Sequence, residues 1–274
     1  MSDLYAVMGN PINHSKSPQI HSAFAEQTGQ DLIYSAILVP LEKFKDEADS
    51  FFRNGRGLNV TVPFKEDAWQ YADTYSSRAL RAGAVNTLIK KENGLIHADN
   101  TDGVGLVRDI TRNHLCSIDG KRVLVLGAGG AVRGILEPLL EEKPTEVVVA
   151  NRTVSKAEAL AQDFANIGKI SGCGFDKIDG QFDLVINGTS ASLGGELPPI
   201  PDTAVHLETV CYDMMYGAGL TVFNQWAQSL NVAATIDGLG MLVEQAAESF
   251  SIWRGISPDS KAVIANIRAS LNPS

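Results

Sequence analysis

Four polar clusters in the first part of the chain combine side chains that could bind a small polar molecule and move a proton. They are G-N-P-I-N-H-S-K-S-P at residues 9–18, N-V-T-V-P-F-K at 59–65, G-A-V-N-T at 83–87 and D-N-T-D-G at 99–103. Serine, threonine and asparagine supply neutral hydrogen-bonding groups, and a lysine beside an aspartate can protonate and polarise a carbonyl. Singly, each cluster has an ordinary interpretation, as a helix cap, a surface lysine or an Asx turn. The combination is more informative than any one cluster.

A second kind of motif is the glycine-rich turn G-A-G-G-A at residues 127–131. It follows a buried-type strand at residues 122–126 and opens a helix with one apolar face. Bare glycines let the backbone approach a pyrophosphate, and the helix N-terminus offers free N–H groups and partial positive charge. The third position of the strict G-x-G-x-x-G pattern is Val132. A tight turn without a ligand is the alternative, but the strand–turn–helix context favours nucleotide binding.

The end of the next strand indicates which nucleotide is bound. Sites for NAD place an acidic residue about 20 residues after the turn, where it accepts hydrogen bonds from the ribose. Here the chain reads Asn151-Arg152-Thr153, with Lys156 in the following turn and no acid. A guanidinium and an amine suit a 2′-phosphate, which a carboxylate would repel. We therefore expect NADP, the alternative being that Thr153 only caps the next helix and Arg152 is a solvated charge.

Composition and charge exclude several classes of protein. The chain has 274 residues, of which 44% are hydrophobic and 20% charged, and this rules out extensive disorder. A formal charge of −9 argues against nucleic acid as a partner. No apolar run reaches the length of a membrane span, no targeting segment is recognisable, and the three cysteines lack disulfide or metal-ligand spacing. We expect a cytoplasmic protein that binds no membrane and no metal, and a homodimer is compatible with the sequence.

Strand and helix patterns alternate along the chain and predict an α/β fold of two domains. From about residue 103 the order strand, glycine turn, helix, strand is a βαβ unit, which implies a Rossmann-type doubly wound parallel sheet. We predict a substrate-binding and catalytic domain at residues 1–102, an NADP-binding domain at 103–238, and final helices within 239–274 that pack back on the first domain. In the first domain we expect strands at 4–7, 32–39 and 58–62, a hairpin of 85–91 with 95–98 around Asn93-Gly94, and helices from Ser17 as N-cap to Gly29, at 41–53 and at 101–114.

Eight motifs, in order and over nearly the whole chain, resemble those of the shikimate dehydrogenase family. They are G-N-P-I-x-H-S-x-S-P, N-V-T-V-P-F-K, A-G-A-V-N-T, D-N-T-D-G, G-A-G-G-A, N-R-T, Y-D-M-x-Y and D-G-L-G-M-L-V-x-Q-A. The resemblance implies an NADP-dependent enzyme of aromatic (chorismate) biosynthesis that interconverts 3-dehydroshikimate and shikimate.

The resemblance also assigns residues of this sequence to three groups. The catalytic pair would be Lys65 and Asp102. Substrate-binding residues would be Ser15, Ser17 and Tyr216 at the carboxylate, and Thr61, Asn86 and Gln245 at the ring hydroxyls with Asn59 nearby. Cofactor-binding residues would be Gly127, Ala128, Gly129, Gly130 and Ala131 at the pyrophosphate, Asn151, Arg152, Thr153 and Lys156 at the adenosine phosphate, and Met214 and Gly238 beside the nicotinamide. Ser77 stands where many members have an acid, and we assign it no role.

General chemistry agrees with this catalytic pair. Oxidation of a secondary alcohol removes a hydride from carbon and a proton from oxygen, and the reverse reaction needs a donor that polarises the carbonyl. Lys65 would exchange this proton while Asp102 orients it, and the sequence is compatible with Lys65 acting as a base or mainly as a positioned charge. Two other functions are a broader dehydrogenase that also takes quinate or uses NAD, and a non-catalytic NADPH-binding sensor. The missing acid after the second strand argues against NAD, and the presence of both catalytic residues argues against a sensor.

Overall fold

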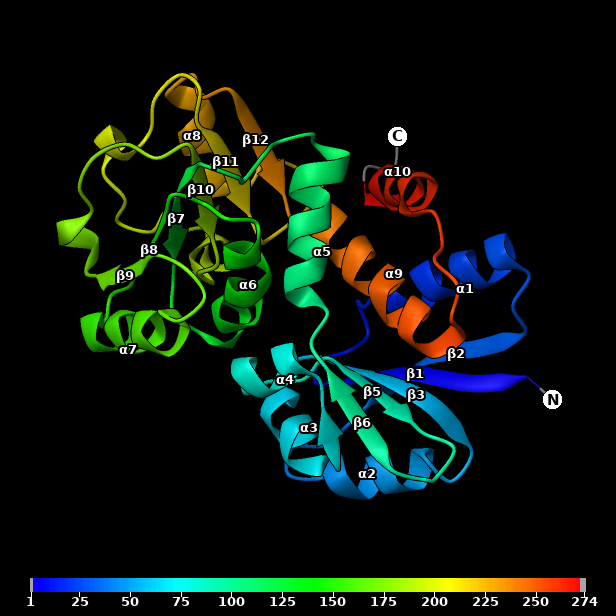
Figure 1. Cartoon of the computed structure of the whole chain (residues 1–274). Helices are drawn as coiled ribbons and strands as arrows, with labels where there is room; N and C mark the ends of the chain where they lie inside the picture. Colours follow the sequence, from blue (N-terminus) through cyan, green and yellow to red (C-terminus); the bar gives the residue numbers. More distant parts are fainter. Residues whose placement is uncertain (1, 272–274) are drawn as a thin grey trace. The chain divides into compact units, whose positions relative to one another are not determined.

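The computed structural model describes residues 2–271, which fold as two compact units (Figure 1). The first, here called the N-terminal unit, contains the chain up to Gly105 together with Val243–Ser270. The second, here called the central unit, contains Leu106–Leu242. Within the described residues, each unit has a six-stranded sheet of its own.

The sheet of the N-terminal unit is mixed, with the strand order β2–β1–β3–β5–β6–β4. β1 pairs in parallel with β2 and β3, whereas β5 and β6 form the expected antiparallel hairpin around Asn93-Gly94. Gly94 has a φ of 84°, a conformation that glycine adopts without steric cost. The strands are β1 (Asp3–Gly9), β2 (Leu32–Leu38), β3 (Gly55–Val60), β4 (Thr74–Tyr75), β5 (Thr87–Lys90) and β6 (Ile96–Asp99).

Helices cover both faces of this sheet: α2 and α3 lie on one face, and α1 and α9 on the other (Figure 1). The alternation of side chains along β1 explains the two layers. Ala6 and Met8 pack in a core that includes residues of α2 and α3, whereas Tyr5 and Val7 pack on the opposite side against Trp253 of α9. The helices are α1 (Ser17–Thr28), α2 (Phe44–Phe51), α3 (Lys65–Tyr71), α4 (Ser77–Ala82), α5 (Asp102–Arg108), α9 (Leu239–Arg254) and α10 (Ser260–Leu271).

The register of this sheet brings all four polar clusters to one edge. The ends of β1 and β3 are adjacent because Met8 pairs with Val60. β5 begins beside the end of β3, and β6 ends beside the start of β5, because Thr87 pairs with both Asn59 and Asp99. The segments that follow β1, β3 and β6 and precede β5 therefore emerge together, although the sequence separates them widely.

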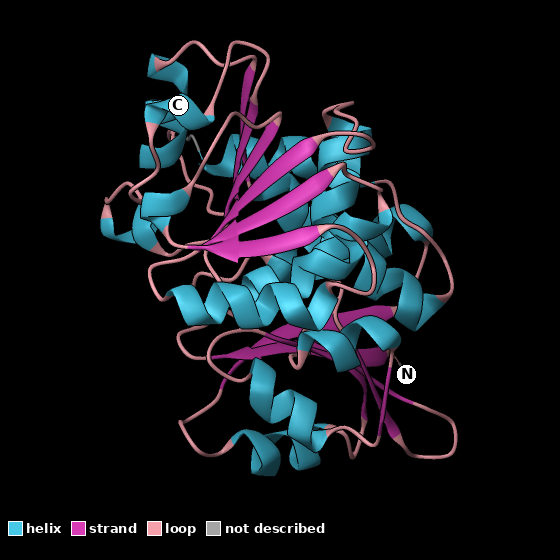
Figure 2. Cartoon of the chain, turned by 60° about the vertical axis from the view of Figure 1, so that its left-hand side comes forward, coloured by secondary structure: helices cyan, strands magenta, loops and turns pink. Residues whose placement is uncertain are grey.

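The sheet of the central unit is parallel throughout, with the order β12–β11–β10–β7–β8–β9. Figure 2 shows the strands of the two sheets in magenta and the helices that cover them in cyan. This is the doubly wound Rossmann order, and it confirms the predicted fold class. Both faces of β7 are buried, since Val123 and Val125 belong to one core and Leu124 and Leu126 to the other. The elements are β7 (Arg122–Leu126), α6 (Gly130–Glu141), β8 (Glu146–Ala150), α7 (Val154–Phe164), β9 (Ile170–Cys173), β10 (Leu184–Asn187), β11 (Val210–Asp213), α8 (Val222–Ser229) and β12 (Ala234–Asp237).

Three helix predictions differ from the structure. Ser17 is the first residue of α1 and not its cap, because Lys16 occupies the N-cap position without a side-chain bond. The helix expected at 41–53 is limited to Phe44–Phe51. The helix expected at 101–114 is α-helical over Asp102–Arg108 and continues as a π-helical turn, Asp109–Asn113, where the buried Asp109 carboxylate accepts a hydrogen bond from Tyr212 Oη at 2.7 Å. Among the described residues, no helix combines the length and apolar character of a membrane span.

Candidate active site

An ion pair between Lys65 and Asp102 lies at the polar edge of the N-terminal unit. Lys65 begins α3, directly after the β3 segment, and Asp102 begins α5, directly after the β6 segment. Lys65 Nζ donates to Asp102 Oδ2 at 2.5 Å, and the side chains are 26% and 12% exposed, respectively. The pair is thus partly shielded from water but accessible to a small molecule, and it combines a proton donor with an orienting carboxylate.

The Asn86 side chain joins this pair to its neighbours. Asn86 Nδ2 lies 2.8 Å from Asp102 Oδ1, 2.9 Å from Thr101 Oγ1 and 3.2 Å from Gln245 Oε1, while Asn86 Oδ1 accepts from Thr101 N at 2.9 Å. An amide nitrogen has two hydrogens, so these three donor contacts cannot all form at once. The site can therefore exchange one of them for a hydrogen bond to a ligand hydroxyl.

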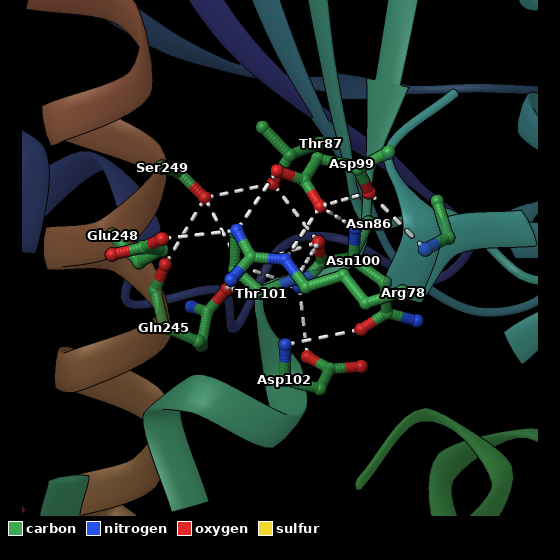
Figure 3. A network of polar contacts seen from close by, with 12 residues as sticks. Arg78, Asn86, Thr87, Asp99, Asn100, Thr101, Asp102, Gln245, Glu248 and Ser249 are labelled. Atoms are coloured by element: carbon green, nitrogen blue, oxygen red, sulfur yellow. Dashed lines mark hydrogen bonds and ion pairs between the residues drawn. The ribbon is translucent and has the colours of Figure 1, made fainter. Parts of the chain in front are cut away.

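Helix α9 contributes to the same network from more than 140 residues further along the chain (Figure 3). Gln245 contacts Asn86, and one turn later Ser249 Oγ lies 2.7 Å from Thr87 Oγ1 and 3.2 Å from Thr101 Oγ1. Residues four apart share one face of a helix, so a single face of α9 supplies both contacts. Gln245 is thereby placed beside Asn86 and Asp102.

Ser15, Ser17 and Thr61 lie at the same edge of the sheet. Ser15 lies between β1 and α1, and Ser17 is the first residue of α1; Ser15 Oγ accepts from Ser17 N at 3.3 Å. Thr61 follows β3, and its backbone N–H donates to Met8 O of β1 at 3.0 Å. These residues add hydroxyl groups to the amide groups of Asn86 and Gln245, a donor set that suits a polyhydroxylated acid.

Asn59 differs from the other predicted substrate-binding residues because its side chain is used within the protein. It is 6% exposed. Its Oδ1 accepts from Tyr34 Oη at 2.7 Å, and its Nδ2 lies within hydrogen-bond distance of Asn86 O, Thr87 Oγ1 and Ser249 Oγ. Asn59 therefore holds Asn86 and Thr87 in position through hydrogen bonds within the protein.

In the central unit, the glycine-rich turn connects β7 to α6 at the carboxyl edge of the sheet, where β7 and β10 are neighbours and the strand order reverses. Gly127 has a φ of 105°, which disfavours other residues. A side chain added at Gly129 or Gly130 would meet nothing within 4 Å. The α6 N-terminus has no side-chain cap and no acid in its first turn. The turn thus leaves open space in front of a helix N-terminus, where the first N–H groups have no acceptor within the helix, as a pyrophosphate requires.

The predicted adenosine-phosphate residues line the same cavity as this turn. A cavity of about 690 Å³ is bounded by all five residues of the turn and by Asn151, Arg152, Thr153 and Lys156. Arg152 and Lys156 are exposed at the end of β8 and the start of α7. Thr153 is the N-cap of α7, but its side chain makes no capping bond, so the capping alternative does not explain its hydroxyl.

Met214, Tyr216 and Gly238 lie at the ends of β11 and β12. A side chain at Gly238 would lie 2.2 Å from Met214 O, so glycine is required for the close approach of these two segments. Tyr216 is half-buried on the loop after β11, and burial raises the pKa of its hydroxyl, which remains a hydrogen-bond donor at neutral pH. It belongs to the central unit, whereas Ser15 and Ser17 belong to the N-terminal unit, so its role at the carboxylate stays a prediction.

Sequence reasoning missed several residues of both sites. Thr87, Thr101 and Ser249 join the network around Asn86, and Arg78 lies beside it. The two threonines stand inside recognised motifs, and Ser249 follows Gln245 by one helical turn, so both signals were available. In the central unit, Thr189, Ser190 and Phe175 also line the cavity. Thr189 and Ser190 follow the buried strand β10, next to β7, which is where ligands bind in doubly wound sheets.

Comparison with protein families agrees with this geometry over most of the chain. Residues 7–88 match the shikimate dehydrogenase substrate binding domain, 109–194 match shikimate / quinate 5-dehydrogenase, and 238–268 match the shikimate 5′-dehydrogenase C-terminal domain. The first match contains Lys65 and Asn86, the second contains the glycine turn, and the third contains Gln245.

Individual proteins are similar over the full length. The shikimate dehydrogenase (NADP(+)) of Cellvibrio japonicus is 59% identical, covering 99% of each chain. The crystal structure of an Ael1 enzyme from Pseudomonas putida has a TM-score of 0.92 at 45% identity, covering 100% of this chain and 99% of that one. Shikimate 5-dehydrogenase from Thermus thermophilus, solved with NADP(H) and shikimate, has a TM-score of 0.88 at 32% identity, covering 98% and 100%. The chain therefore belongs to the shikimate dehydrogenase family.

Proposed function

We propose that this protein is an NADP-dependent shikimate dehydrogenase, which reversibly reduces 3-dehydroshikimate to shikimate in aromatic (chorismate) biosynthesis. The observation on which this depends most is the Lys65–Asp102 pair, with Asp102 bonded in turn to Asn86. A non-catalytic sensor would have no need of an ammonium and a carboxylate held together at the edge of a polar site.

The central unit provides the features that NADP needs. The open glycine turn fits the pyrophosphate, and Arg152 and Lys156 fit a 2′-phosphate. When bound, NADP supplies or accepts the hydride of the reaction. No acidic residue occupies the Asn151-Arg152-Thr153 segment, which favours NADP over NAD.

The residues of the N-terminal unit hold the substrate and exchange its proton. Lys65 donates to the carbonyl oxygen during reduction and accepts the hydroxyl proton during oxidation, while Asp102 keeps the ammonium directed at that oxygen. Thr61, Asn86 and Gln245 bind the ring hydroxyls. Ser15 and Ser17 bind the carboxylate through neutral donors. A substrate that lacked a hydroxyl would leave one of these groups unpaired, which is costly in a buried site.

The cysteines support a cytoplasmic setting for this enzyme. Cys116, Cys173 and Cys211 are all free thiols, and Cys211 is buried. Burial raises the pKa of the Cys211 thiol to about 12, so it stays unreactive. A chain that folds with three unpaired cysteines suits a reducing compartment.

The direct test is NADPH formation, followed by absorbance, after the purified chain is mixed with NADP and shikimate. We expect rapid reduction of NADP with shikimate and much slower reduction when quinate replaces shikimate or NAD replaces NADP. Absence of reduction with every pair would overturn the proposal, and equal rates with quinate would change the substrate to a broader class.

A further inference from the structure

The side chain of Arg78 is partly buried, and its guanidinium binds two carboxylates at once (Figure 3). Its Nε and Nη2 donate to the two oxygens of Asp99 at 2.7 and 2.8 Å, and Nη2 also donates to Glu248 Oε1 at 2.9 Å. The Arg78 side chain is 21% exposed, and those of Asp99 and Glu248 are 11% and 15% exposed. Asp99 opens the D-N-T-D-G motif, but none of the roles described above uses Arg78, Asp99 or Glu248.

Asp99 links the guanidinium to the segment that presents the catalytic carboxylate. It is the last residue of β6, and its Oδ1 also accepts from Ser76 Oγ at 2.6 Å and from the backbone N–H of Asn100 at 2.7 Å. Asn100 Oδ1 then accepts from the backbone N–H of Asp102 at 3.1 Å. Burial by itself would raise the pKa of Asp99, but the bonds from Arg78 lower it overall, so the carboxylate is ionised and binds the guanidinium strongly.

Glu248 links the same guanidinium to the helix that presents Gln245. Gln245 and Glu248 are three residues apart on α9 and therefore lie on one face of that helix. Ser249, the next residue, contacts Thr87 at the start of the hairpin. A single side chain thus joins the turn before Asp102 to the helix carrying Gln245, two segments that lie far apart in the sequence.

We propose that Arg78 is a positioning residue for shikimate, which fixes Gln245 of α9 relative to Asp102 without touching the substrate. The inference rests on the proposed function and goes beyond it. Arginine is needed because its planar fork satisfies both oxygens of Asp99 while a second hydrogen of Nη2 is directed at Glu248. An ammonium at this position would bind at most part of this arrangement, because it has no planar pair of donors that matches the two oxygens of a carboxylate.

The main test is steady-state kinetics of Arg78→Met and of the conservative variant Arg78→Lys. We expect Arg78→Met to raise KM for shikimate roughly 10-fold and to lower kcat up to about 100-fold, because small displacements of reacting groups are costly. Arg78→Lys should restore part of this loss. KM for NADP should stay within about twofold of wild type, since the glycine turn belongs to the other unit. Wild-type turnover of shikimate, measured in the same series, separates failure of this inference from failure of the proposed function.

Two further measurements distinguish positioning from a purely structural role. A double-mutant cycle combines Arg78→Met with Gln245→Ala. The double variant should raise KM for shikimate by less than the product of the two single increases, because Arg78→Met already displaces Gln245. The matched control is Arg122→Met, which removes another arginine–carboxylate pair, with Glu146 at 3.0 Å, from the central unit. It should lower thermal stability without changing KM for shikimate. The inference is overturned if Arg78→Met also lowers only stability, or if the cycle is multiplicative.

Discussion

The two sites of this protein are built in opposite ways. In the N-terminal unit, Asn86, Thr101 and Asp102 are 3%, 0% and 8% exposed and are bonded to one another and to α9. In the central unit, Gly129, Arg152 and Lys156 are exposed, and no side chain caps the N-terminus of α6. One site is a closed network of side chains, whereas the other is an open turn with cations beside it.

The difference follows from what each site must do. The proposed proton transfer requires Lys65 and the substrate to be aligned within fractions of an ångström, and the hydrogen bonds among Asn86, Thr101 and Asp102 hold these side chains in place before the substrate arrives. The phosphates of a dinucleotide carry enough negative charge to bind exposed backbone N–H groups and cationic side chains. The dinucleotide must also dissociate after each turnover, which an open site permits. The contrast predicts that changes in the network will alter chemistry and stability together, and that changes in the turn will alter cofactor binding alone.

The largest effect should come from Lys65→Ala. Removal of the ammonium takes away the proton donor, so kcat should fall roughly 10²–10⁴-fold with little change in KM for shikimate. Steady-state rates measured with saturating NADP test this. The control is Lys43→Ala, which removes an exposed lysine paired with Asp46 at 3.1 Å and should leave kcat unchanged. Turnover near the wild-type rate in Lys65→Ala would remove this lysine from the mechanism.

A smaller effect is expected from Arg152→Ala in the open site. Loss of a charge-assisted hydrogen bond should raise KM for NADP roughly 10–100-fold and leave kinetics with NAD nearly unchanged. Because the side chain is exposed, the melting temperature should not move. Parallel assays with the two cofactors provide the measurement, with Lys169→Ala as an exposed control in the same unit. An unaltered preference for NADP would refute the assignment of Arg152.

The double variant Ser15→Ala/Ser17→Ala tests whether binding and chemistry are separate within the closed site. Two hydrogen bonds from the neutral serine donors to the carboxylate should together contribute about 1.5–3 kcal/mol to the free energy of substrate binding. KM for shikimate should therefore rise roughly 10-fold or more, while kcat changes little. A collapse of kcat at constant KM would show that these serines belong to the reacting part of the site.

The smallest expected effect is on how the free energy of unfolding depends on pH, through the buried side chain of His21. His21 of α1 stacks on Tyr34 with ring centroids 4.2 Å apart, and burial lowers its pKa from 6.5 to about 3. The folded state therefore excludes a proton that the unfolded chain binds below pH 6.5, so stability is complete above 6.5 and is lost as pH falls toward 3. Urea unfolding at several pH values over this range gives the slope of the free energy of unfolding against pH. In His21→Gln this slope should be smaller than in the wild type by up to about 1.4 kcal/mol per pH unit. Equal slopes in the two proteins would exclude His21 as the cause.

Much of the fold could be predicted from local patterns. The hairpin at Asn93-Gly94 and the strand–turn–helix at residues 122–141 have strong local signals, because their geometry is set by neighbouring residues. The boundaries near Ser17 and Leu41 were wrong, since turn-forming residues at a helix start satisfy several conformations and tertiary contacts choose among them.

Motif residues of the site were easier to predict than the contacts that hold them. Lys65, Asp102 and Asn86 stand in motifs, and the structure brings them together. Arg78 had no signal of its own, because an arginine in a short helix is an ordinary residue, and the signal for Ser249 was limited to its position one helical turn after Gln245. Their partners lie up to 190 residues away, and only the fold defines such pairs.

The N-terminal unit is discontinuous in sequence, and this affects the order in which the protein can fold. All strands of the central unit lie in one continuous segment, Leu106–Leu242, so its sheet can form while the ribosome is still adding the remainder of the chain. The N-terminal unit, in contrast, is complete only after α9 has been synthesised, because Asn59 and Asn86 form hydrogen bonds with Ser249 and Gln245 of that helix. Contacts across such long loops form slowly. We therefore expect the N-terminal unit to complete its folding after the central unit, although most of it is synthesised first.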